Sequence, residues 1–215
     1  MNILSIESST RMCSVSVSSK ERVSFRYFMS KKTDIKKILL MIEKCCKDTE
    51  CTFNDIQLLV FGRGPGSFTG IRTVVGIIQG LAFWKKLPVI GVSSMRIMAK
   101  ISQKKFNSKN ILVVMDAKND NLYFAEYKIK DNGDIIGEKT ERVISFNEFF
   151  SITYKMKEKF IVLEKDFHSF VKKTKNLEGC LIYRTFPKAK NIFSLVKLKN
   201  FSNFEIIKPN YLENN

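Results

Sequence analysis

A glycine-rich segment at residues 62–70 has the spacing most suggestive of a chemical site. A turn of this kind between a strand and a helix can bind phosphate through its backbone N–H groups. The segment lacks the Gly-Lys-Ser/Thr ending of a P-loop, and Thr69 stands where a dinucleotide fingerprint begun at Gly64 needs glycine. A phosphate site and a tight turn that caps the next helix both remain open. The residues concerned are Gly62, Gly64, Pro65, Gly66, Thr69 and Gly70.

Two carboxylates, Glu7 and Asp116, each follow an expected strand at equivalent places in two similar stretches of sequence. In a two-lobed ATPase, carboxylates at such positions would face the phosphates and Mg²⁺. Alternatively, they accept hydrogen bonds from the backbone of their own turns, as Asp and Glu often do. We treat both residues as candidates for the remnant of a nucleotide site.

No other residues form a catalytic set. His168 is the single histidine, so neither a Ser/His/Asp arrangement nor a paired-histidine metal site is available. Cys45, Cys46 and Cys51 lack a paired C-x-x-C spacing, which disfavours zinc. We therefore expect no catalytic residue, no metal and no cofactor bound by this chain.

The helix expected at Thr69–Phe83 carries two unusual glycines. Its apolar stripe consists of Ile71, Val74, Val75, Ile78, Leu81 and Ala82. Gly76 and Gly80 lie four residues apart beside Thr73 and Phe83, and each glycine costs roughly 1 kcal/mol relative to alanine inside a helix. Something must therefore pack closely there, and both the protein's own sheet and a helix of a partner chain fit.

The surrounding elements predict an α/β protein of two lobes, at residues 1–108 and 109–215, with a C-terminal tail that is free to return to the first. Antiparallel hairpins at Ile3–Val17 and Ile111–Ile129 open the two lobes, and their shared pattern indicates a weak internal duplication. In the first lobe we expect a helix that is capped by Thr33, with Asp34 in its first turn. One face of that helix holds Ile35, Ile38, Leu39, Ile42 and Cys45. Residues 168–198 give no clear pattern.

Composition and charge limit the function classes. Hydrophobic residues make up 44% of the 215 residues and charged residues 27%, which excludes a disordered chain. No apolar run is long enough for a membrane span, and five cysteines without a signal peptide indicate the cytoplasm. The net charge is +16, and residues 56–115 hold nine basic residues and no acid. This charge would attract RNA or an acidic protein, unless it reflects only a lysine-rich proteome.

Several blocks of sequence together resemble the TsaB (YeaZ) family. They are Ile6–Thr10, Phe61–Arg72, Gly76–Ala82, Pro88–Ser93, Met115–Lys118, Tyr123–Tyr127 and Pro209–Leu212. The resemblance implies an actin-like ATPase (ASKHA) fold of two lobes, each a mixed sheet flanked by helices. This chain departs from the family at Asp34, where members often have histidine.

The resemblance also implies a function. A family member is a non-catalytic scaffold that acts with TsaD and TsaE to make N6-threonylcarbamoyladenosine at position 37 of tRNAs reading codons that begin with A. ATP and a metal are used by the partner subunits, and tRNA is reached through the complex. The surface implied to bind TsaD, or a second copy, contains Arg72, Thr73, Gly76, Gly80 and Phe83. The alternatives are an actin-like phosphotransferase, a peptidase and a plain basic RNA-binding module.

Overall fold

The computed structural model describes residues 1–30, 33–106, 108–154, 159–164, 180–196, 209–210 and 212. His168 lies outside these residues. The chain forms two compact units, one of Met1–Ile97 with Pro187–Asn210 and the other of Met98–Phe186 with Tyr211–Asn215. The expected lobe boundary after residue 108 stays a prediction.

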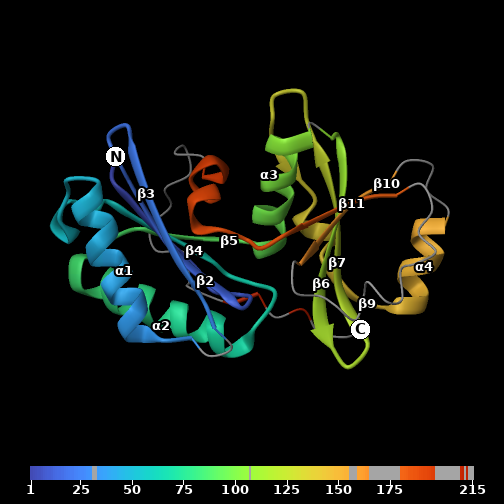
Figure 1. Cartoon of the computed structure of the whole chain (residues 1–215), viewed down its shortest axis with the longest axis horizontal. Coiled ribbons are helices and arrows are strands. Elements are labelled where there is room, and N and C mark those ends of the chain that lie inside the picture. Colours follow the sequence, from blue (N-terminus) through green and yellow to red (C-terminus); the bar gives the residue numbers. More distant parts are fainter. Residues whose placement is uncertain are drawn as a thin grey trace. The chain divides into compact units, whose positions relative to one another are not determined.

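The first unit is built on a five-stranded mixed sheet in the order β3-β2-β1-β4-β5. The strands β1 (Ile3–Glu7), β2 (Met12–Ser19) and β3 (Arg22–Met29) pair antiparallel, whereas β4 (Leu58–Gly62) and β5 (Val89–Val92) continue the sheet parallel to β1. Helices α1 (Ile35–Asp48) and α2 (Phe68–Lys85) cover one face of this sheet (Figure 1). Their buried side chains form one apolar core with those of the strands.

The opposite face of this sheet contacts the chain's C-terminal part. The short 3-10 helices η3 (Ala189–Asn191) and η4 (Phe193–Leu195) follow each other there (Figure 1). The Ser5 hydroxyl donates to the Ala189 carbonyl at 3.0 Å, and the Ala189 N–H donates to the Ser14 hydroxyl at 3.1 Å. These bonds help to satisfy the buried hydroxyl groups of both serines.

The second unit contains a six-stranded mixed sheet in the order β11-β10-β6-β7-β8, with β9 also paired to β7. Its strands are β6 (Asn110–Lys118), β7 (Asn121–Ile129), β8 (Ile135–Ile136), β9 (Arg142–Ser145), β10 (Lys159–Glu164) and β11 (Cys180–Thr185). Helix α4 (Phe146–Tyr154) packs on this sheet through Phe149 and its neighbours, and α3 (Ser94–Phe106) precedes β6. A 3-10 turn, η2 (Glu138–Thr140), precedes β9, and another, η1 (Phe53–Asp55), precedes β4.

The two predicted hairpins are confirmed, in separate sheets. Strands β1 and β2 pair antiparallel from Ile3↔Ser18 to Glu7↔Ser14, and β6 and β7 pair in the same manner. The predicted cap of α1 is wrong by one residue, because Asp34 is the N-cap and its carboxylate accepts from the Lys37 N–H at 3.1 Å. Either side chain is chemically able to cap, so composition could not choose between them.

Candidate functional site

The glycine-rich loop packs directly on the turn that follows β1. The Ser67 N–H donates to the Ser9 carbonyl at 2.6 Å, and the Ser67 hydroxyl caps α2 by accepting from the Gly70 N–H. A Cβ atom on Gly66, whose φ is +143°, would lie 2.2 Å from the Ser9 oxygen. A Cβ atom on Gly70 would lie 2.0 Å from the Ser8 oxygen. Only glycine permits so close an approach of two backbone segments.

The middle of the same loop is held by three other segments of the first unit. The Arg63 N–H donates to the Val92 carbonyl at 2.9 Å, and the Ser94 N–H donates to the Gly64 carbonyl at 2.8 Å. From the C-terminal part of the chain, the Asn210 N–H donates to the Arg63 carbonyl at 2.8 Å. Pro65 follows Gly64 through a cis peptide bond. The loop is thus engaged with its own chain along much of its length.

Glu7 lies beneath this loop with its carboxyl group enclosed. One carboxylate oxygen accepts from the Ser9 N–H at 2.6 Å, and the other accepts from the Ser94 hydroxyl at 3.0 Å. A Cβ atom on Gly62 would lie 1.6 Å from a Glu7 oxygen, so the glycine makes room for the carboxyl group. Complete burial raises the pKa of Glu7, and the hydrogen bonds offset only part of that rise.

Asp116 occupies the corresponding place in the second unit but has a different environment. It lies near a bulge at the end of the β6–β7 pairing and is partly exposed. One carboxylate oxygen accepts from the Lys118 N–H at 2.8 Å, and the other pairs with the Lys118 ammonium at 2.5 Å. The Asp116 N–H points to the Glu164 carboxylate at 3.4 Å. Glu7 and Asp116 therefore lie in different units, each with partners from its own.

The outward face of α2 is uncovered. The buried residues of this helix are Gly70, Ile71, Val74, Val75, Ile78 and Ala82. Cβ atoms added to Gly76 and Gly80 would meet nothing within 4 Å among the described residues. The explanation that these glycines serve the protein's own sheet is therefore wrong. Beside them, Phe83 is 88% exposed and Trp84 64% exposed.

The other residues assigned to this face are fixed within α2 itself. The Thr73 hydroxyl donates to the Thr69 carbonyl at 2.8 Å, and the Arg72 guanidinium lies 3.7 Å from the centre of the Phe68 ring. An Arg held over an aromatic ring keeps a defined position at the helix surface. The named residues Arg72, Thr73, Gly76, Gly80 and Phe83 thus share one helix, in the first unit.

Sequence reasoning missed two apolar residues of the neighbouring helix. Ile35 and Leu39, expected on one apolar face with Ile38, Ile42 and Cys45, are 52% and 47% exposed, whereas Met41 and Cys46 are buried. The apolar stripe of α1 is wider than the face that its own sheet covers. That width was the available signal, because a helix with one partner needs a narrower stripe. Helix α1 lies next to α2 on the same side of the sheet (Figure 1).

The described residues contain neither a metal-binding cluster nor a membrane-spanning helix. All five cysteines are free thiols, and the described residues hold no group of three side chains suited to a metal ion. Burial raises the pKa of Cys13 to about 11, so this thiol stays protonated at neutral pH. Within the described ranges, no helix combines the length and apolar character that crossing a membrane requires.

Known proteins resemble this chain over most of its length. A family profile described as TsaD, tRNA N6-adenosine threonylcarbamoyltransferase, matches residues 29–200. The "tRNA threonylcarbamoyladenosine biosynthesis protein TsaB" of Buchnera aphidicola subsp. Schizaphis graminum is 33% identical over 198 residues, which are 92% of this chain and 94% of that protein. The Escherichia coli K12 protein of the same name is 38% identical over 144 residues, 67% of this chain and 62% of that protein.

Solved structures show the same fold. The structure titled "YeaZ from Pseudomonas aeruginosa" matches with a TM-score of 0.74 at 23% identity, covering 90% of this chain and 89% of that one. A second Pseudomonas aeruginosa structure, of an uncharacterized protein with similarity to peptidase YEAZ, matches with a TM-score of 0.76 and the same coverage and identity. The expected actin-like fold, with a mixed sheet in each half, is confirmed.

Proposed function

We propose, from the premise that this chain belongs to the TsaB (YeaZ) family, that it acts in the biosynthesis of N6-threonylcarbamoyladenosine in tRNA. Its specific role is that of a non-catalytic subunit that binds TsaD. TsaE joins this pair, and the complex modifies adenosine 37 of tRNAs reading codons that begin with A. The site of action is the cytoplasm.

The uncovered glycine face of α2 carries this proposal. A helix backbone that lacks Cβ atoms at Gly76 and Gly80 lets a second helix approach more closely than larger residues would allow. On α2 itself, the apolar side chains of Phe83 and Trp84 are exposed beside the stripe, and α1 also exposes Ile35 and Leu39. Exposed apolar residues grouped in this way are typical of protein interfaces. The same face is suited to self-association when TsaD is absent.

The state of the two candidate carboxylates favours a scaffold over an enzyme. Glu7 is enclosed by its own chain, and Asp116 is paired with Lys118. Within the described ranges, neither carboxyl group lies beside a paired nucleophile and histidine or lysine base, as many acyl- and phosphoryl-transfer sites require. We infer that this subunit transfers no group itself, that it binds no cofactor, and that ATP and a metal are used by its partners.

The experiment tests the α2 face with Gly80→Leu. A leucine there adds bulk in the path of the partner backbone, and such overpacking commonly costs ~1–3 kcal/mol. We expect affinity for the cognate TsaD to fall by roughly five- to a hundredfold, measured by calorimetry, with a melting temperature at or above that of the parent, because leucine is also a better helix former than glycine. Any dimer of the chain alone should weaken as well.

Ser151→Leu on α4 is the matched control, because it adds a leucine at an exposed helical site in the other unit. It should leave TsaD binding unchanged. Unchanged TsaD affinity of Gly80→Leu would contradict the proposed interface. Sustained ATP hydrolysis by the purified chain, lost on replacing Glu7 or Asp116, would instead establish the phosphotransferase alternative.

A further inference from the structure

Strand β3 is an unprotected edge of the first sheet. It pairs with β2 on one side, residue for residue from Met12↔Met29 to Ser19↔Arg22, and no described strand pairs with its other side. Natural edge strands are commonly protected by lysine, proline, a bulge or a short length. The eight residues of β3, Arg-Val-Ser-Phe-Arg-Tyr-Phe-Met, contain no lysine and no proline, and their pairing has no bulge. The charges of the two arginines are neutralised within the unit, Arg22 by Glu50 and Arg26 by Asp48.

Several exposed side chains of β3 are of the types that normally pack against a neighbouring strand. Val23, Tyr27 and Met29 are large apolar residues and are about half exposed. Valine and aromatic residues favour strands because they pack against side chains of the next strand. On β3 these side chains can pack against those of β2 on one side. On the outer side they can pack in the same way against the side chains of an added strand.

A groove lies between this edge and helix α1. Its apolar lining comes from Tyr27 and Phe28 on β3 and from Leu40 and Met41 on α1, and its volume is about 200 Å³. That space is suited to one apolar side chain of a peptide that runs along β3. The groove is on the β3 side of α1, whereas the glycine stripe belongs to α2, so the two surfaces are separate.

The net positive charge of the groove lining indicates which kind of partner can bind there. Arg26, Lys37 and Lys44 complete its lining, and no acidic residue contributes to it. Asp48 neutralises Arg26 at 2.7 Å, whereas Asp34 is 3.9 Å from the Lys37 ammonium and also caps the helix. No described carboxylate pairs with Lys44 within 4.0 Å. The surplus is positive, which favours an acidic partner and opposes a second copy bringing the same lysines to this edge.

We propose that an extended acidic segment of another protein docks along the outer edge of β3. Its backbone extends the sheet by one strand, one apolar side chain enters the groove, and its carboxylates pair with Lys37 and Lys44. This is strand addition, in which main-chain hydrogen bonds give affinity and side-chain contacts give specificity. The two lysines are seven residues apart, about 10 Å along the helix. Carboxylates four residues apart on one face of an extended chain are about 13 Å apart, and the long lysine side chains span the difference.

The test uses a capped, fluorescently labelled eight-residue peptide in which alternate positions are glutamate, leucine and glutamate, with valine between them. The leucine and both glutamates then share the strand face that meets the groove and the lysines of α1. We expect it to bind the full-length protein, more weakly as salt rises, and to slow hydrogen exchange of β3 amides. Matched peptides have lysine in place of glutamate, or methylated backbone nitrogens. Neither should bind comparably, because one reverses the charge and the other removes the hydrogen-bond donors.

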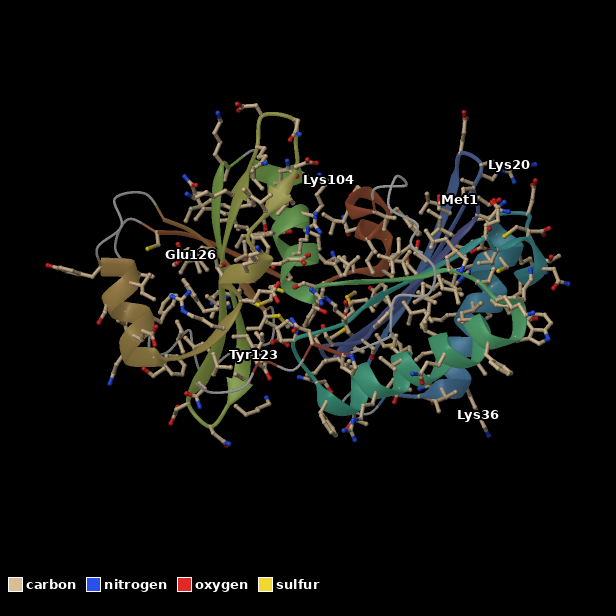
Figure 2. The ribbon with its side chains drawn as sticks, turned by 180° about the vertical axis from the view of Figure 1, so that it is seen from behind. Met1, Lys20, Lys36, Lys104, Tyr123 and Glu126 are labelled. Atoms are coloured by element: carbon tan, nitrogen blue, oxygen red, sulfur yellow. The ribbon has the colours of Figure 1, made fainter. Side chains whose placement is uncertain are left out.

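Variants of the protein separate this surface from general charge. The double variant Lys37→Glu, Lys44→Glu should weaken the acidic peptide roughly tenfold, which is what two exposed ion pairs contribute together. The double variant Lys36→Glu, Lys47→Glu is the control, because it makes the same charge change on the same helix at two exposed residues that do not line the groove. The Lys36 side chain projects away from the ribbon (Figure 2). The control variant should change the affinity less than twofold. Circular dichroism confirms that each variant is folded.

Three results would overturn the proposal. The first is equal binding of the acidic and lysine peptides. The second is binding of the acidic peptide that leaves hydrogen exchange of β3 unchanged. The third is a concentration-dependent dimer of the protein that itself protects β3, because the occupant would then be a second copy.

Discussion

At the scale of single residues, Glu7 is a buried carboxyl group whose ionisation is coupled to folding. Its pKa is raised in the folded protein by burial, above the ordinary value of 4.5. Folding therefore favours the protonated form, and the unfolded chain releases this proton first as pH rises. The contribution of Glu7 to stability is complete below about pH 4.5 and decreases as pH rises toward its folded pKa.

The variant Glu7→Gln tests this ionisation. A glutamine side chain keeps an oxygen for the Ser9 N–H and an amide for the Ser94 hydroxyl, but it does not ionise. We expect the variant to gain stability relative to the parent protein as pH rises from 5, by at most about 1.4 kcal/mol per pH unit. Urea unfolding at a series of pH values measures the difference. Parallel stability curves would mean that Glu7 has an ordinary pKa.

The environment of Glu7 also shows which contacts of a single residue cannot be predicted from the sequence. The residue itself was identifiable, because a carboxylate directly follows an apolar strand. Its relation to Gly62 was not, because the two residues are far apart in the chain. They meet only because β1 and β4 pair in parallel, with Ile6 opposite Phe61. The glycine was therefore interpreted as part of a turn, although its missing Cβ makes room for a carboxyl group.

At the scale of elements, α2 contains glycines that are closely packed and glycines that face open space. Substitution by alanine distinguishes the two kinds. Gly70→Ala places a Cβ atom 2.0 Å from the Ser8 oxygen, so we expect it to destabilise the protein by ~1–3 kcal/mol. Gly76→Ala places its Cβ in open space and should stabilise the helix by up to about 1 kcal/mol. Urea unfolding of both variants measures the contrast, and similar effects of the same sign would contradict it.

Elements whose signal is local were predictable, and those whose partners are distant were not. The alternation in residues 13–18 and the periodicity in residues 69–83 fixed a strand and a helix. The pattern of α1 predicted the helix but put the exposed Ile35 and Leu39 on one face with the buried Ile38, Ile42 and Cys45. Periodicity does not show how much of an apolar stripe the protein's own sheet covers. Strand β11 escaped prediction because it lies in a stretch without a clear sequence pattern and is defined by parallel pairing with β10.

At the scale of the whole molecule, the positive charge is the property that sequence alone leaves undecided. The acid-free stretch from residue 56 to 115 includes Lys85 and Lys86 at the end of α2 and Lys104 and Lys105 on α3. Lys86, Lys104 and Lys105 are exposed, and Lys85 is partly buried beside the Asn54 carbonyl. A charge that arose by drift in composition would act equally wherever it lies. The effect of a functional charge would depend on where its residues lie on the protein.

Reversing these four lysines to glutamate separates the two cases. We expect the assembled complex to bind tRNA more weakly, with a shallower dependence of affinity on salt, because each lost phosphate contact lowers the number of released counterions by about one. The control reverses Lys20, Lys36, Lys47 and Lys128, which are exposed and lie outside the stretch. It changes the net charge by the same amount. Filter binding across a salt series, with modification measured in parallel, compares the two sets. Equal losses in both would mean that only total charge matters, and normal binding of the first set at every salt concentration would assign the charge to composition alone.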